Sequence, residues 1–168
     1  MNDRIVDEIV ARLRERYGSL AAPRFGFVQE MMTADPYASL VQRLIDDFDC
    51  QDETEPNDDV SFGYLLTNRR GAWVLRVSMV GPYAVLLRLR DGGVADVVES
   101  GGAGITEDER RLLRALKTEG IRALGRETLD EPISLALSNT SPGKVRVFQA
   151  LFTDTDVLPW DRCAAATR

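Results

Sequence analysis

The sequence predicts an α+β fold, because two kinds of apolar periodicity occupy different parts of the chain. Apolar residues recur every three or four positions before residue 50 and again after residue 106, whereas between residues 60 and 99 the period is two. A content of 44% hydrophobic and 29% charged residues is typical of a globular protein. A chain of 168 residues can bury enough surface to fold without disulfides or a structural metal. We therefore expect a single domain over residues 1–168.

Two helices are expected at the N-terminal end. The first has a cap at Asn2 or Asp3, carries apolar residues on one face and charges on the other, and ends near Gly18. The second follows Asp35, which precedes a proline and is a suitable N-cap, and its apolar stripe continues to Phe48. The residues between these two helices show no pattern that predicts an element.

An antiparallel meander of four strands is expected next. The three connections are rich in glycine, proline or asparagine, which favour tight turns. The alternation within each run predicts one core face and one face that is at least partly solvated. The expected strands are Val60–Thr67, Ala72–Val80, Tyr83–Arg90 and Val94–Glu99.

A third helix begins at Thr106, which forms a capping-box pattern with Glu109. The helix is expected to pause at a glycine and to resume over residues 121–124. Pro132–Leu137 and Lys144–Phe152 are then expected as two further strands on the same sheet, followed by an irregular C-terminal tail.

The absence of histidine excludes several classes of site. Without it there is no Ser-His-Asp or Cys-His machinery and no imidazole metal ligand. Cys50 and Cys163 are far apart in sequence, and Cys50 lies among carboxylates that suppress its thiolate. The N-terminus has no secretory-signal pattern, and no apolar run approaches the ~20 residues of a membrane span. We therefore expect a cytoplasmic protein without catalytic residues, cofactors or metals.

The most unusual feature is an acidic segment at residues 46–59, which contains no basic residue. Without its eight carboxylates, 19 of the 27 acidic residues would remain against 21 basic ones, so the net charge of −6 originates here. Such a concentration of charge attracts basic partners and accelerates their encounter. The eight acidic residues are Asp46, Asp47, Asp49, Asp52, Glu53, Glu55, Asp58 and Asp59.

Two interpretations of this acidic segment remain open. It is either a solvated connector whose charge aids solubility, or a docking surface for a positively charged protein. A calcium loop is disfavoured, because the order of the acids lacks the EF-hand alternation and its central glycine. Trp160, in the short C-terminal segment, either attaches the tail to the body or serves as an exposed contact.

Three arginines of the meander form a second candidate site. We expect Arg76, Arg88 and Arg90 to lie on the same sheet face, where they pair with acids of a covering helix or bind an anionic ligand. Structural pairing is the commoner use of such charges, so we favour it. The basic residues of the third helix lie beside acids and form no continuous stripe for nucleic acid.

The meander and the tail resemble small immunity proteins of bacterial polymorphic-toxin and contact-dependent-inhibition systems. The resemblance implies a stoichiometric inhibitor, in which a rigid α+β body blocks the active site of a toxin, often a basic nuclease, with an acidic surface that imitates the nucleic-acid backbone. The resemblance assigns no functional role to any residue of this sequence, because these families diverge widely. The segments that carry it are Phe62–Leu66, Trp73–Leu86, Leu151–Asp154 and Leu158–Trp160.

The first hypothesis is therefore a non-enzymatic cytosolic protein that binds a basic toxin domain, with the eight acids of residues 46–59 as the steering patch and Trp160 as a further contact. It involves no direct contact with nucleic acid or membrane. One alternative is a small-molecule binding module or enzyme that holds an anion with the sheet arginines. Another is an adaptor subunit of a larger complex, for which an exposed edge strand would be the sign.

Overall fold

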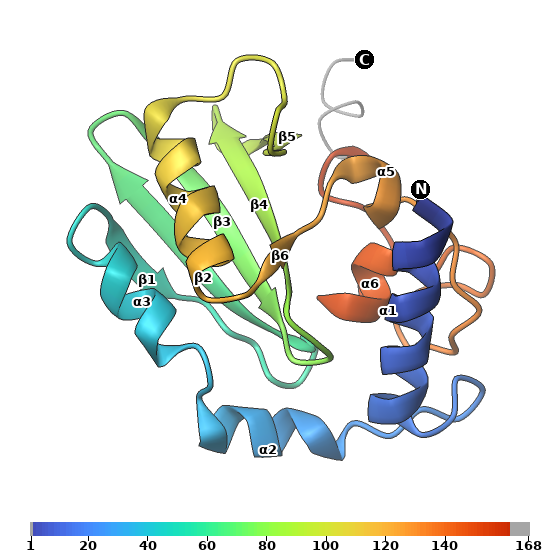
Figure 1. The fold of residues 1–168 in the computed structure, drawn as a ribbon. Helices are drawn as coiled ribbons and strands as arrows, with labels where there is room; N and C mark the ends of the chain where they lie inside the picture. The colour runs from blue at the N-terminus through green and yellow to red at the C-terminus, as the bar shows by residue number, and fades with distance from the viewer. Residues whose placement is uncertain (1, 162–168) are drawn as a thin grey trace.

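The structure is a computed structural model that describes residues 2–161, and it has the expected α+β architecture (Figure 1). Three helices precede a strand meander, and three further helices follow it. None of the helices in the described range is long and apolar enough to cross a membrane. Cys163 and the rest of the expected tail after Asp161 lie outside the described residues. The helices are α1 (Asn2–Tyr17), α2 (Gly26–Ala34), α3 (Ala38–Leu44), α4 (Glu107–Thr118), α5 (Arg126–Leu129) and α6 (Val147–Leu151).

The sheet is an antiparallel meander with one short parallel addition. Its strands follow the order β1-β2-β3-β4-β5, and β6 runs parallel to the start of β4. The β4–β5 turn consists of Asp91 and Gly92, both with positive φ, as a type I′ hairpin requires. The strands are β1 (Asp49–Asp52), β2 (Ser61–Asn68), β3 (Gly71–Ser78), β4 (Tyr83–Arg90), β5 (Gly93–Val97) and β6 (Arg122–Ala123).

The two faces of the sheet have different covers. On the first face, α4 covers the strands with α3 beside it (Figure 1). Trp73 on this face contacts both the ring of Phe48 and the carboxylate of Glu109. We call this the α4 face. On the opposite face, the hydroxyls of Ser61 and Ser78 donate to carbonyls of the α6 segment. We call this the α6 face. The core therefore extends through both sides of the sheet.

The C-terminal part differs from the sequence prediction. The prediction of a strand is wrong for residues 147–151, which form helix α6, and Pro132 makes only an isolated bridge to Arg146. A short apolar run does not distinguish a buried strand from a buried helix, and the side chain of Phe148 is fully enclosed here. Residues 122–123, expected to be helical, instead form β6 because their backbone pairs with β4.

Candidate functional site

The acidic segment is not a free loop. Residues Asp49–Asp52 form β1, whose Cα register pairs Asp49 with Thr67 and Asp52 with Tyr64 of β2. The amide of Glu53 donates to the carbonyl of Gly63 at 2.8 Å, which extends this pairing. β1 is the end of the strand order, so its outer edge is unpaired among residues 2–161. The backbone of residues 49–53, the central part of the predicted docking surface, is thus held in place by the sheet.

Seven of the eight acidic residues are exposed, and we call this surface the acidic edge. The eighth, Asp59, is only 5% exposed, and its carboxylate lies 3.0 Å from Arg76 Nη1. Asp59 therefore belongs to the body of the protein rather than to the surface on which we expected it. The acidic edge consists of Asp46, Asp47, Asp49, Asp52, Glu53, Glu55 and Asp58.

The negative charge of the acidic edge is almost unneutralised. Within the described part of the chain, Asp47 is its only member with a basic side chain inside 4.0 Å, at 3.8 Å from Arg111. Asp52 Oδ1 accepts a hydrogen bond from the amide of Thr54 at 2.9 Å, which fixes the side chain but adds no positive charge. The surface is therefore electrostatically complementary to a basic partner.

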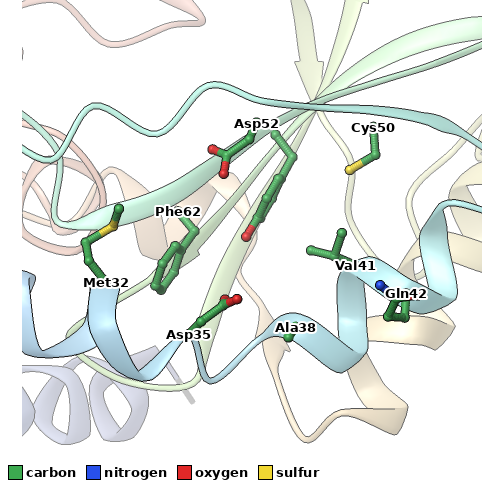
Figure 2. A pocket seen from close by; sticks show the side chains of 9 residues that line it. Met32, Asp35, Ala38, Val41, Gln42, Cys50, Asp52 and Phe62 are labelled. Carbon is green, nitrogen blue, oxygen red and sulfur yellow. The ribbon is translucent and has the colours of Figure 1, made fainter.

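A pocket of about 300 Å³ opens beside β1 (Figure 2). Figure 2 shows Asp52 on the strand side of this acidic pocket and Asp35 on the helix side, with Phe62 and Met32 forming an apolar wall. It lies on the α4 face of β1 and β2, against the connection between α2 and α3. The lining residues are Met32, Asp35, Ala38, Val41, Gln42, Cys50, Asp52, Phe62 and Tyr64.

Asp35 contributes to this pocket because of an unusual backbone conformation. The sequence predicted Asp35 as an N-cap, but it ends α2 in the left-handed region, with φ 43° and ψ 62°. Its amide donates to the carbonyl of Met31 at 2.9 Å. Aspartate and asparagine tolerate this conformation better than most residues. The chain reverses there, and the carboxylate borders the pocket.

Tyr64 is the most buried polar residue of the acidic pocket. It is 5% exposed, and its hydroxyl makes no hydrogen bond to any of the described residues. Burial and the nearby negative charges of Asp52 and Asp35 raise the pKa of Tyr64 well above its ordinary value, so the phenol keeps its proton. Burial together with Asp52 and Asp49 also raises the pKa of the Cys50 thiol, which makes it a poor nucleophile.

The pocket offers two carboxylates and a neutral phenol, which suits binding of a cation. No group of three His, Cys, Asp or Glu side chains within residues 2–161 is arranged to hold a metal ion. Neither Asp35 nor Tyr64 was predicted as a site residue, because Asp35 matched a capping pattern and Tyr64 lies within an expected strand. The one feature of the sequence that could have indicated the site is a tyrosine within an expected strand, because a buried tyrosine hydroxyl usually needs a hydrogen-bond partner.

The three sheet arginines do not converge. The register pairs Arg76 with Val85 and Arg88 with Trp73, so Arg76 and Arg88 lie on opposite faces, contrary to the prediction. The prediction failed because alternation within a strand does not reveal its register with a neighbour. Arg88 lies on the α4 face and holds Glu109 of α4 with two hydrogen bonds of 2.6 Å, while Arg90 is exposed at the end of β4.

Arg76 and Arg90 do border a common groove of about 810 Å³ on the α6 face. We call it the sheet groove. Its charge is partly balanced, because Arg76 is paired with Asp59. Its apolar walls come from the strands and from the C-terminal segment, through Val74, Leu87, Leu89, Val94, Val157 and Pro159.

Trp160 attaches the C-terminal segment to the body. It is 7% exposed, and its ring lies edge-on to Phe148 with 5.3 Å between the centroids. The guanidinium carbon of Arg126 lies 5.7 Å from the centre of the indole. Of the two roles that the sequence left open, the structure shows packing rather than an exposed contact.

Comparison with known proteins yields no relative. No protein-family model matches the sequence, and no curated protein or solved structure is significantly similar to the chain.

Proposed function

We propose that the protein is a non-enzymatic binding protein that captures a basic protein partner through the acidic edge. The single observation that carries this proposal is the set of seven exposed carboxylates on and around a sheet-anchored strand, of which only Asp47 has a cationic neighbour in residues 2–161. Together with the resemblance to immunity proteins, this supports a role as the stoichiometric inhibitor of a basic bacterial toxin domain in the cytoplasm.

Electrostatic complementarity explains how such a surface would work. A concentrated negative field steers a basic partner toward one side of the molecule and raises the association rate by about 10- to 1,000-fold. Because β1 is hydrogen-bonded to β2, the carboxylates of Asp49 and Asp52 are presented on an ordered backbone, and less conformational entropy is lost on binding. Acidic side chains on an edge strand also oppose pairing with a second copy of that strand.

Charge reversal on the acidic edge tests the proposal. The variant Asp49→Lys/Glu53→Lys/Glu55→Lys is expected to associate at least about tenfold more slowly with the partner at low ionic strength. The association rate should also depend less on salt, because the steering field has been removed. The partner is obtained by co-purification from the native host, and the rates are measured by stopped-flow mixing over a salt series.

A matched control separates the local field from the net charge. Asp7→Lys/Glu15→Lys/Glu127→Lys changes the net charge equally, but these three exposed residues lie on α1 and α5. We expect association close to that of the unmodified protein. Equal slowing by both variants, or none by either, would remove the acidic edge from the mechanism.

The sheet groove supports a second candidate function, the binding of an amphipathic anion. Its volume is in the range of small-molecule sites, and Arg90 is exposed beside apolar walls. The probe is 8-anilinonaphthalene-1-sulfonate, whose fluorescence reports binding. If the groove is a ligand site, the probe should bind saturably and about tenfold more weakly to Arg90→Gln, because one charge-assisted contact is lost. Binding that is absent or unaffected by Arg90→Gln would exclude this function.

A further inference from the structure

We infer that the acidic pocket receives an arginine side chain from the basic partner, between the carboxylates of Asp35 and Asp52. This inference rests on the proposed function and assigns a specific anchor within the binding surface. The two carboxylates approach the cavity from opposite walls, one from β1 and one from the end of α2 (Figure 2). Neither has an ion-pair partner among residues 2–161, so neither charge is compensated internally.

Tyr64 provides an independent indication of a ligand. A buried tyrosine usually places its hydroxyl on a hydrogen-bond partner, as Tyr17 does with the carbonyl of Ala150 at 2.8 Å. Tyr64 is 5% exposed, but its hydroxyl oxygen is accessible in the pocket that the residue lines, and it has no hydrogen-bond partner in the described part of the chain. A phenol can accept a hydrogen bond from a cationic N–H group while it donates to a carboxylate. Tyr64 therefore complements the two aspartates.

The shape and walls of the pocket favour a long cationic side chain. The volume of about 300 Å³ is at the lower limit of small-molecule sites and suits one side chain. Met32 and Val41 offer apolar surface to an aliphatic stem, while the ring of Phe62 borders the same space. A calcium ion would need about six to eight oxygen ligands, more than two aspartates provide.

Arginine fits this environment better than lysine. Its guanidinium is planar, stacks on aromatic rings and is more weakly hydrated than an ammonium group, so it enters a half-buried site more readily. Several N–H donors can reach carboxylates on two walls at once. The pocket adjoins the acidic edge through Asp52, so an inserted arginine would lie beside the steering charges.

The test compares two aspartates of the same strand. Asp52 and Asp49 are both on β1, but Asp52 lines the pocket and Asp49, three residues earlier, is on the opposite sheet face. Asp52→Asn is expected to weaken binding of the co-purified partner at least tenfold, mainly through faster dissociation. Asp49→Asn removes the same charge and should weaken it less than threefold. Asp35→Asn should weaken binding of the partner as much as Asp52→Asn does. It preserves the end of α2, because asparagine tolerates the left-handed conformation.

A small probe identifies the chemistry without the partner. N-acetyl-arginine amide is titrated into the ¹⁵N-labelled protein, with the citrulline and lysine analogues in parallel. We expect saturable amide shifts at Gln42, Cys50 and Tyr64 with arginine, smaller shifts with lysine and none with neutral citrulline. Tyr64→Phe should weaken the arginine response at least threefold while leaving the unfolding midpoint unchanged, since the hydroxyl bonds to no described residue.

The outcomes separate this inference from the proposed function. If Asp52→Asn and Asp49→Asn weaken binding of the partner equally while the triple charge reversal still slows association, the pocket does not hold an anchor. The acidic edge then acts only through its electrostatic field. Equal shifts with arginine and citrulline would likewise overturn the inference. If the triple reversal has no effect, the proposed function itself is wrong.

Discussion

Replacement of Glu109 by alanine is expected to reduce the free energy of unfolding by about 3–5 kcal/mol, the usual loss when one partner of a buried ion pair is removed. Glu109 is 1% exposed, and its two oxygens accept four hydrogen bonds. They come from Trp73 Nε1, the amide of Thr106 and two nitrogens of Arg88. The substitution would leave the guanidinium and the indole N–H without this acceptor beneath α4.

The carboxyl group of Glu109 should also make the free energy of unfolding depend on pH. Burial raises the pKa of Glu109, but the hydrogen bonds from Arg88, Thr106 and Trp73 outweigh it, so the pKa lies below the ordinary value of 4.5. A carboxyl whose pKa is lower in the folded state stabilises the protein above the unfolded pKa and loses this contribution as the pH falls through the folded pKa. Below pH 4.5, the unmodified protein should therefore lose stability more steeply than Glu109→Gln.

Urea unfolding at pH 7 and over the acidic range measures both effects. Glu107→Ala is the matched control, because Glu107 is also in the first turn of α4 but its side chain is 62% exposed. Its effect should stay within about 0.5 kcal/mol. In a double-mutant cycle, the total loss of unfolding free energy in the Glu109→Ala/Arg88→Ala variant should be smaller than the sum of the losses in the two single variants. A loss below about 1 kcal/mol, or strict additivity, would contradict the role that we assign to this network.

The capping box of α4 could be predicted from the sequence, whereas the contact of α4 with the sheet could not. Thr106 and Glu109 were identified from their spacing, and both reciprocal hydrogen bonds are present. The partnership of Glu109 with Arg88 was not predictable in the same way, because it depends on which face of β4 the helix covers. Local hydrogen bonds follow from sequence spacing, whereas contacts between elements require the strand register and the packing of the helix.

The strands of the meander could likewise be predicted from local sequence patterns, whereas β1 and the acidic pocket could not. Turn residues and alternating apolar positions specify β2 to β5, and the class and order of these strands are confirmed. β1 was missed because Asp49-Cys50-Gln51-Asp52 has low intrinsic strand propensity and becomes a strand only by pairing with β2. The charge of the acidic segment was visible in the sequence. The pocket was not, because the turn at Asp35 brings α2 and α3 to β1 only in the folded chain.

Replacement of Trp160 by alanine is expected to cost about 3–5 kcal/mol of unfolding free energy, as is usual when a large buried aromatic side chain is deleted. The indole packs edge-on against Phe148, whose side chain is fully enclosed, and it lies beneath Arg126. Its loss would open a cavity where the C-terminal segment meets α6. Trp160→Phe keeps much of this apolar volume and should cost less than the alanine variant.

Thermal or urea unfolding decides between the two roles that the sequence allowed for Trp160. A packing residue changes the unfolding free energy, whereas an exposed contact residue changes only the affinity for the partner. The control Val157→Ala removes an apolar side chain of the same segment that is 44% exposed, and its effect should stay within about 0.5 kcal/mol. If Trp160→Ala unfolds like the unmodified protein but binds the partner more weakly, Trp160 belongs to the interface. The binding surface would then extend from β1 to the C-terminal segment instead of being confined to the acidic edge and its pocket.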